Sequence, residues 1–214
     1  VNWTQRQPAQ VPPARMVHAM TADWVNGRIV LFGGRSSTFT DLNDTWAWNG
    51  TNWTQLASSG PSPRCCFDVV QDIVRGRIVL FGGGGAVQPG DTWEFDGIAW
   101  QQMQPMTAPT ARYGHRMCYD PARNRMILHG GSVGSGETWQ WDGVTWTLLD
   151  TTVDRQDHVL VYDWQVGRAT MYGGTNLSQG LVDTTMTFGI ATPATLVPFG
   201  RGCPGPKGTP QLAT

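Results

Sequence analysis

Charge is scarce in this chain of 214 residues. Asp, Glu, Lys and Arg together make up 14% of the sequence, and lysine occurs once, at Lys207, while glutamate occurs at Glu94 and Glu137. The formal net charge is -1, and the charged residues are spread along the chain. Proteins that bind nucleic acid or anionic membranes carry a basic stripe or patch. We therefore expect neither nucleic acid nor an anionic membrane surface as a partner.

Long hydrophobic runs and helical periodicity are also missing. No apolar stretch approaches the ~20 residues of a membrane-spanning helix, so we expect no membrane insertion. No segment spaces its apolar residues as an amphipathic helix does. Glycine and tryptophan are abundant instead, with 27 and 11 residues. This composition favours a turn-rich β protein of a secreted kind over a helical cytosolic enzyme.

The four cysteines, Cys65, Cys66, Cys118 and Cys203, do not have the spacing of a zinc site. Cys65 and Cys66 are adjacent, and successive residues of a strand point to opposite faces, so at most one of them is expected in the core. Cys118 is predicted to be a core residue, and Cys203 stands in a Gly- and Pro-rich tail. We expect no cofactor.

The octapeptide GRIVLFGG stands at residues 27–34 and again at 76–83, as part of a fourfold repeat. Each copy starts at an arginine and has a histidine or phenylalanine three residues later, an aspartate at eight, an arginine at thirteen and a Gly-Gly pair from eighteen. No insertion interrupts this stretch in any copy. The starting arginines are Arg15, Arg64, Arg112 and Arg155.

Each copy continues with a motif that predicts a β-hairpin. NDTWAWNGTNW at 43–53, GDTWEFDGIAW at 90–100 and GETWQWDGVTW at 136–146 each place two tryptophans seven residues apart around Asn-Gly or Asp-Gly, the turn residues of tight hairpins. The fourth copy, VDTTMTFGIAT at 182–192, keeps Asp183 and Gly189 but lacks both tryptophans. Each repeat is therefore predicted to contain four short strands.

The order of Arg-x-x-His, a hydrophobic run ending in Gly-Gly, and Asp-Thr-Trp resembles the kelch repeat over roughly residues 1–190. The resemblance implies an all-β fold, a kelch-type β-propeller of four repeats that form four-stranded blades around a channel. The propeller would span residues 1–192. The Gly/Pro-rich tail at 193–214 resembles the start of a segment that follows such repeats in some secreted bacterial proteins, so we expect an extracellular location.

The first residues predict how the ring closes. VNWTQ at 1–5 matches TNWTQ at 51–55, so Trp3 has the character of a fourth-strand tryptophan that precedes any first strand. Because the last repeat lacks that tryptophan, we expect residues 1–6 to pair with the last blade, which would remove two exposed sheet edges. Two alternatives stay open: a fragment of a longer ring, and one ring shared by two chains.

Loop lengths single out one face of the predicted propeller. The loops between the second and third strands and the loops between repeats vary in length, and they lie on the same face. Variable loops on a rigid scaffold are common binding surfaces. The candidate loops are 35–43, with Phe39 at its tip, 84–90, 132–136 and 175–182.

The four starting arginines begin the innermost strands on this same face. They are expected either to pair with acidic residues that begin the third strands, or to form a ring of guanidinium groups that binds an anion or a polar glycan. The acidic residues are Asp44, Asp91, Glu137 and Asp183.

Three histidines share one repeat position, three residues after the starting arginine: His18, His115 and His158. If they face the channel, the imidazoles converge and could hold zinc or copper, although we expect no metal and local hydrogen bonds instead. Trp24 and Trp164 stand in the turns between first and second strands. There an exposed indole either stacks on a sugar ring or packs partly against its own blade.

Three classes of function follow. We expect a secreted, non-catalytic binding module that contacts a glycan or a protein through the variable loops. The first alternative is a kelch-type enzyme, an oxidase or a carbohydrate-active enzyme, with its site at the channel mouth; Tyr113, Tyr119 and Cys118 supply residue types of such an oxidase site, but no motif matches. The second is a structural component of a surface or filament, which would self-associate.

Overall fold

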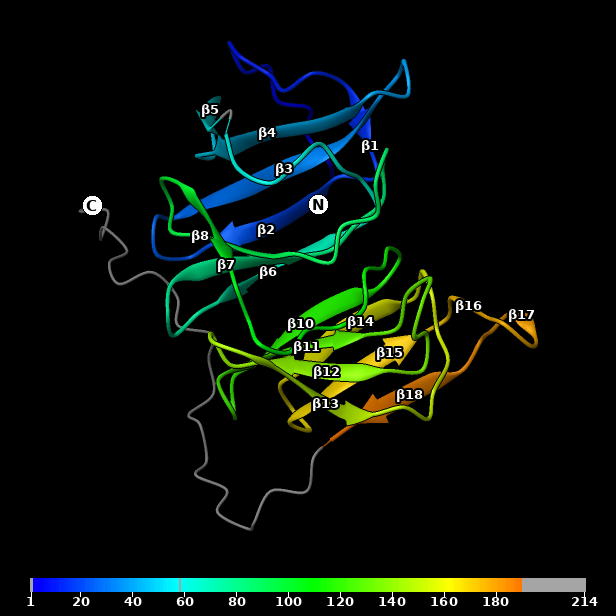
Figure 1. Ribbon diagram of the computed structural model, residues 1–214. Coiled ribbons are helices and arrows are strands. Elements are labelled where there is room, and N and C mark those ends of the chain that lie inside the picture. Colours follow the sequence, from blue (N-terminus) through cyan, green and yellow to red (C-terminus); the bar gives the residue numbers. More distant parts are fainter. Residues whose placement is uncertain (1, 58, 190–214) are drawn as a thin grey trace.

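The computed structural model describes residues 2–57 and 59–189, and all the regular structure in those ranges is β-strand. No helix that could cross a bilayer is found among them. Among the described residues the strands form four main antiparallel sheets and one two-stranded hairpin, and the main sheets follow one another in chain order as the blades of a four-bladed propeller arrangement (Figure 1). The all-β, four-bladed prediction is confirmed. Residues 190–192 of the predicted propeller and the tail at 193–214 lie outside the described residues.

Each blade is a set of neighbouring strands in an antiparallel ladder. Blade 1 contains β1 (Arg15–Met16), β2 (Ala19–Asp23), β3 (Arg28–Ser36), β4 (Asp41–Trp48) and β5 (Trp53–Ala57). Blade 2 contains β6 (Asp68–Asp72), β7 (Arg77–Phe81), β8 (Thr92–Phe95) and β9 (Trp100–Met103). Blade 3 contains β10 (Arg116–Asp120), β11 (Arg125–His129), β12 (Thr138–Trp141) and β13 (Trp146–Asp150). Blade 4 contains β14 (Val159–Asp163), β15 (Arg168–Tyr172) and β18 (Thr185–Phe188), beside a small hairpin of β16 (Thr175–Asn176) and β17 (Gly180–Leu181).

The hairpin turns between third and fourth strands form as predicted. The glycine of each Asn-Gly or Asp-Gly pair has a positive φ, 97° at Gly50 and 99° at both Gly97 and Gly143, a conformation that glycine adopts without strain. The side chain before each glycine accepts hydrogen bonds from backbone N–H groups of its own turn; Asp96 Oδ1, for example, accepts from Ile98 and Ala99 at 2.8 Å. These turns therefore set the register of the outer strands.

The hydrophobic core is divided among the interfaces between blades. Alternate residues of the inner strands face the preceding and the following blade, so that both sides of a central blade are buried. Phe32 of blade 1 packs with Val69 and Leu80 of blade 2, and Phe81 of blade 2 packs with Met117 and Leu128 of blade 3. A third cluster joins blades 3 and 4. The continuous apolar runs in the second strands are explained by this burial on two sides.

Backbone hydrogen bonds join successive blades in two repeated series. The N–H of the second glycine of each Gly-Gly pair donates to the carbonyl of the next starting arginine, at 2.9 Å for Gly34 to Arg64, Gly83 to Arg112 and Gly131 to Arg155. The other series links the residues two positions after the starting arginines: Cys66 donates to Val17, Gly114 to Cys66 and Asp157 to Gly114, at 3.1, 2.9 and 2.8 Å. The three interfaces therefore have one common design.

The predicted pairing of residues 1–6 with the last blade is not formed. Residues 2–6 belong to no strand and are exposed, with Trp3 fully accessible to solvent, and within the described residues the main sheet of blade 4 has three strands. The innermost strands pack in the order β2, β6, β10 and β14, whereas β14 and β2 share no comparable packing. A hydrogen bond from Ala9 N–H to Asn52 Oδ1, at 2.9 Å, keeps the N-terminal segment at blade 1. Within residues 2–57 and 59–189, the four blades thus form an arc whose two outer flanks are uncovered.

Candidate functional site

Three of the starting arginines pair with carboxylates on the face that carries the variable loops. We call this the loop face, formed by residues 35–43, 84–90, 132–136 and 175–182. Arg15 makes two hydrogen bonds to Asp44, of 2.6 and 2.7 Å, and Arg64 makes two to Asp91, of 2.7 and 3.0 Å. Arg112 also pairs with a carboxylate, that of Glu137.

These guanidinium groups are also tied to the backbone. Arg64 Nη1 donates to the carbonyl of Gly82 at 2.9 Å, and the side chain of Arg64 is fully buried, as is that of Arg112. Burial alone raises the pKa of Asp91, but hydrogen bonds from Arg64 and Trp93 outweigh it and hold the pKa of that carboxyl below its ordinary value. The predicted arginine–carboxylate pairs therefore exist, and their donors are engaged within the protein.

Arg155 departs from the pattern because β18 is shifted by one residue relative to the sequence alignment. Tyr172 pairs with Thr185, where Phe81 of blade 2 pairs with Thr92, so Thr184 rather than Asp183 takes the carboxylate position. Arg155 Nη2 donates to Thr184 Oγ1 at 2.5 Å. The expected Arg155–Asp183 pair is thus replaced by an arginine–hydroxyl contact. Arg155 Nε is buried without a hydrogen-bond partner among the described residues.

His115 and His158 lie between blades, whereas His18 belongs to blade 1 and is half-buried, and the three imidazoles do not converge. The ring of His115 packs edge-on against Phe81 of the preceding blade, with centroids 5.7 Å apart, and the ring of His158 packs against His129 at 5.3 Å. Burial, followed by the charge of Arg112, lowers the pKa of His115 to about 3; burial and then His129 lower that of His158 to about 3. In the part of the chain that the structure describes, no group of three His, Cys, Asp or Glu side chains is arranged to hold a metal ion.

The residues two positions after the starting arginines all have a left-handed backbone. The φ angles are 49° at Val17, 58° at Cys66, 70° at Gly114 and 54° at Asp157. This conformation is uncommon for non-glycine residues, and least favourable for a β-branched one such as valine. These four residues are the ones joined by the second series of inter-blade hydrogen bonds, so the arrangement turns their N–H and C=O groups toward the neighbouring blades.

The left-handed backbone at Cys66 also overturns the prediction that adjacent cysteines point apart. The two sulfur atoms of Cys65 and Cys66 lie 3.1 Å from each other. Cys65 is buried and Cys66 is partly exposed. Burial and the neighbouring Cys66 thiol raise the pKa of Cys65 to about 12, so this thiol stays protonated at neutral pH. Cys118 is buried as predicted, and Cys203 lies outside the described residues.

Every variable loop carries an exposed apolar side chain. In blade 1 the ladder of β3 and β4 continues into the loop, where Arg35 pairs with Asp41 at 2.7 Å and Phe39 stands at the tip, 73% exposed. The tips of this hairpin and of the β16–β17 hairpin project on the same side of the molecule, at the right of Figure 1. The exposed apolar residues of the four loops are Phe39, Val87, Val133, Leu177 and Leu181.

Trp24 and Trp164 lie on the opposite side of the molecule, which we call the turn face. It is formed by the tight turns at 24–27, 73–76, 121–124 and 164–167 and by the hairpin turns at 49–52, 96–99 and 142–145. Both indoles are about 60% exposed. The ring of Trp164 contacts Tyr162 edge-on at 5.6 Å, and the backbone N–H of Trp24 donates to Gln71 Oε1. These two residues therefore do not share a site with Phe39.

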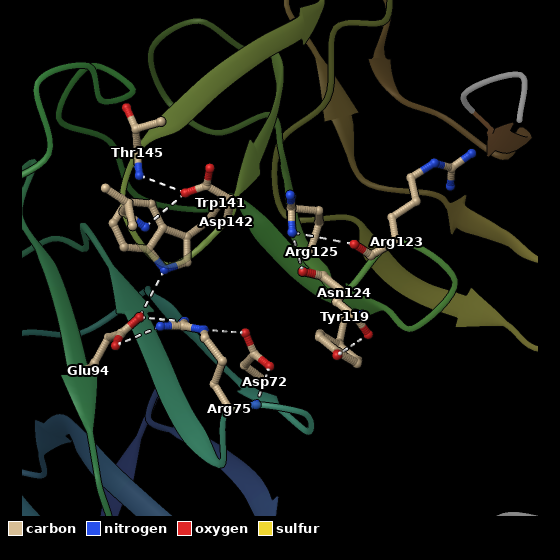
Figure 2. A network of polar contacts seen from close by, with 11 residues as sticks. Asp72, Arg75, Glu94, Tyr119, Arg123, Asn124, Arg125, Trp141, Asp142 and Thr145 are labelled. Atoms are coloured by element: carbon tan, nitrogen blue, oxygen red, sulfur yellow. Dashed lines mark hydrogen bonds and ion pairs between the residues drawn. The ribbon is translucent and has the colours of Figure 1, made fainter.

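A polar network near the turn face was not anticipated from the sequence (Figure 2). Arg75 donates to Asp72 Oδ2 at 2.8 Å and to both oxygens of Glu94, at 3.0 and 2.5 Å, and Glu94 Oε1 also accepts from Trp141 Nε1 of blade 3 at 2.9 Å. Both carboxylates are buried. The network joins blades 2 and 3, and the side chains named here all have partners. Arg75 recurs in one other repeat, as Arg123 of blade 3, which pairs with Asp120 as Arg75 pairs with Asp72; this position is not shared by all four repeats, so the repeat pattern did not single it out.

Asp68 is a further acidic group, partly buried, that the repeat pattern does not reveal. Burial raises the pKa of Asp68 to about 6, against hydrogen bonds from the backbone N–H of Met117 and Val69 and the charge of Arg116. Its Oδ2 atom accepts from Met117 N–H in blade 3 at 2.8 Å. Asp68 thus connects two blades.

No known protein-family model matches the chain. The tRNA wybutosine-synthesizing protein 4 of Emericella nidulans is 31% identical to it over 115 residues, which are 47% of this chain and 11% of that protein. The matched segment is therefore a small part of a much longer protein. The resemblance to kelch repeats therefore stays a sequence prediction.

Proposed function

We propose that this propeller is a non-catalytic binding module that contacts a glycan or a protein through its loop face. The observation that carries the proposal is the presence of an exposed apolar side chain on each of the four variable loops, with an aromatic ring on the longest of them, 35–43. Aromatic rings stack on sugars and supply contact area to protein partners at a small entropic cost. The ladder of β3 and β4 holds this loop in one shape, which favours binding because less ordering is needed.

The polar groups near this face support binding more than catalysis. Arg15, Arg64 and Arg112 donate to carboxylates and carbonyls of their own blades, so these guanidinium groups serve the scaffold. Arg155 is buried as well and donates to Thr184 Oγ1 and to the carbonyl of Asp154, so it too serves the scaffold. An extracellular location is part of the proposal, because low charge and high glycine and tryptophan content are typical of secreted β proteins.

A glycan array, probed with the purified chain after metal removal and again after metal is restored, tests the proposal. The variant Phe39→Ala should lose binding at least about tenfold, as expected for a central aromatic contact. Trp24→Ala is the matched control, since it removes a similarly exposed aromatic ring from the turn face. Both variants should keep the urea midpoint of the parent.

Two outcomes decide against the glycan form of the proposal. A blank array in both metal states would exclude the glycans tested and direct the search to protein ligands. Binding that is lost in Trp24→Ala but kept in Phe39→Ala would place the ligand on the turn face and contradict the proposal.

A further inference from the structure

A cavity of about 260 Å³ lies between blades 3 and 4. Blade 3 contributes His129 and Thr138 to its wall, and blade 4 contributes Met171 and Phe188. The other two inter-blade interfaces have a side chain at the corresponding place.

A fourth-strand tryptophan fills that place in both cases. Trp146 of blade 3 packs against Phe81 and Trp141, with ring centroids 5.4 Å apart in each case, and its indole N–H donates to Thr92 Oγ1 at 2.9 Å. One blade earlier, Trp100 packs against Phe32 and Phe95 and donates to Thr45 Oγ1 at 2.9 Å.

The residues that line the cavity have the same repeat positions as the residues that contact Trp100 and Trp146 in the other two interfaces. In the strand ladders Ala169 pairs with Phe188 as Ile78 pairs with Phe95, so Phe188 has the place of the third-strand aromatic ring. His129 and Thr138 have the same repeat positions in blade 3 as Phe81 and Thr92 in blade 2. The cavity is thus shaped for a fourth-strand tryptophan, and the fourth repeat has Thr192 where the others have that residue.

Trp3 has the sequence context of a fourth-strand tryptophan but belongs to no strand among the described residues. Residues 2–5 repeat residues 52–55, which include the start of β5, and Trp3 is fully exposed. It precedes Arg15 by 12 residues, and Trp100 precedes Arg112 by the same number, so the connection from Trp3 to blade 1 has the length of a connection between consecutive blades.

The two outer flanks of the arc are complementary halves of the repeated interface. On blade 4 the residues that would face a following blade are exposed, among them Val159, Val161 and Tyr172. On blade 1 the residues that would face a preceding blade, Met20 and Ile29, are also exposed.

The backbone groups of the flanks match as well. If the bonds from the second glycine of each Gly-Gly pair continued to another blade, Gly174 N–H would donate to the carbonyl of Arg15. If the bonds between residues two positions after the starting arginines continued, Val17 N–H would donate to the carbonyl of Asp157. Neither bond is formed within residues 2–57 and 59–189.

Closure within one chain conflicts with the packing of the blades. The three interfaces share one design, so together they set the curvature of the arc, and β14 and β2 do not come together. Trp3 is held to blade 1 through Ala9, and the six Cα-to-Cα steps from Trp3 to Ala9 span at most about 20 Å. In Figure 1 blades 2 and 3 separate blade 1 from blade 4.

We propose that residues 2–6 of a second copy of this chain pair with β18 and insert Trp3 into the cavity, while blade 1 of that copy covers the open flank of blade 4. The exchange is reciprocal, because the second copy offers the same cavity and flank to the first. Two arcs then close one ring of eight blades with two-fold symmetry, a size within the range of known propellers. Trp3 makes the contacts that Trp100 and Trp146 make inside the chain.

Size-exclusion chromatography with light scattering on the full chain is the first test. The parent and Trp24→Ala should run at twice the chain mass of 23.4 kDa. Trp3→Ala should raise the dissociation constant of the dimer at least about 30-fold, the effect of losing one central tryptophan at an interface. Trp3 is exposed in the single chain, so this variant should fold normally by circular dichroism. A parent that keeps the mass of one chain at every concentration overturns the proposal.

Cross-linking separates a second copy from the chain's own N-terminus. By analogy with the pairing of Glu94 with Gln101, Thr187 should lie opposite Thr4 of the other copy. A chain with Thr4→Cys and Thr187→Cys, oxidised with oxidised glutathione, should give a covalent species of twice the chain mass. Controls that carry only one of the two substitutions should give none. A disulfide that joins the two introduced thiols within one chain, identified by peptide mapping, would mean closure in the same chain and would overturn the proposal.

Discussion

The indole N–H of Trp146, the first residue of β13, donates a 2.9 Å hydrogen bond to Thr92 Oγ1, the hydroxyl of the first residue of β8 in the preceding blade. Trp100 and Thr45 make the same contact one blade earlier, also at 2.9 Å. A fourth-strand tryptophan therefore stabilises two blades at once, through its ring and through its N–H group.

Removing Trp146 should cost far more stability than removing Trp53. Trp146 is 1% exposed and lies between blades 2 and 3, whereas Trp53 is half-buried on the outer flank of blade 1. Trp146→Ala should lower the free energy of unfolding by about 3–5 kcal/mol, the usual cost of a large buried aromatic residue. Urea denaturation of both variants measures the difference. If both variants lost the same free energy of unfolding, the contact of Trp146 between blades would not be a source of stability.

The pair of Arg64 and Asp91 should be a strong scaffold contact. Arg64→Ala leaves a carboxylate without its buried cation and should cost about 3 kcal/mol or more. Arg35→Ala breaks the more exposed Arg35–Asp41 pair and should cost less than about 1 kcal/mol. Urea midpoints at neutral pH compare the two. A cost below about 1 kcal/mol for Arg64→Ala would show that the arginine is dispensable for folding.

The repeat made much of this structure predictable. Four aligned arginines, aspartates and Gly-Gly pairs predicted four blades, and the Asn-Gly and Asp-Gly dipeptides predicted hairpin turns, which form at Gly50, Gly97 and Gly143. The loop with Phe39 and the pairs of Arg15, Arg64 and Arg112 with carboxylates were also anticipated. These features depend on local turn chemistry and on positions that recur, so one copy informs the others.

The remaining features depend on contacts that no single repeat contains. The register of β18 is shifted by one residue, which places Met186 and Phe188 toward blade 3, and a gapless alignment of sequences does not show such a shift. The left-handed backbone at Cys66, which brings its sulfur to that of Cys65, follows from the hydrogen bonds between blades. The open arc likewise follows from the packing of whole blades. The sequence of residues 1–6 predicted closure with the last blade, because it does not show how strongly the blades curve.

Buried histidines should make the protein sensitive to acid. The pKa of His115 is about 3 in the folded state, below the ordinary value of 6.5, so the unfolded chain takes up a proton first as the pH falls. The stability that the neutral imidazole contributes is present above pH 6.5 and decreases toward pH 3. The loss is about 1.4 kcal/mol for each pH unit, so the stability lost by about pH 4 is at most about 3 kcal/mol.

His115→Phe isolates this contribution, since Phe67 has the same repeat position in blade 2 and packs on Phe32 at 5.5 Å in the same way. The stability of the variant should fall less than that of the parent between pH 6.5 and about pH 4. Asp68 has the opposite effect on stability: its pKa is raised to about 6 in the folded state, so the folded state binds this proton more readily as the pH falls. Because Asp68 is present in both proteins, its effect cancels in the comparison. Parallel pH profiles for the two proteins would contradict the assignment.

Val17→Gly should stabilise the fold. The φ of 49° at Val17 is unfavourable for a β-branched side chain, and the same repeat position in blade 3 is Gly114. Relief of this strain should exceed the extra entropy of glycine in the unfolded chain and raise stability by about 1 kcal/mol. Val25→Gly, an exposed valine in a turn of the same blade, should instead lose stability. Thermal unfolding of both variants tests the difference, and a loss in Val17→Gly would exclude strain at this residue.

The binding face is the central functional claim, and hydroxyl-radical footprinting tests it most directly. The protein would be oxidised alone and with the glycan that binds it most tightly on the array. We expect Phe39, Val87, Val133 and Leu177 on the loop face to become protected, while Trp24, Ile98 and Trp164 on the turn face stay as reactive as in the free protein. Protection of the turn face with an unchanged loop face would contradict the proposed binding site.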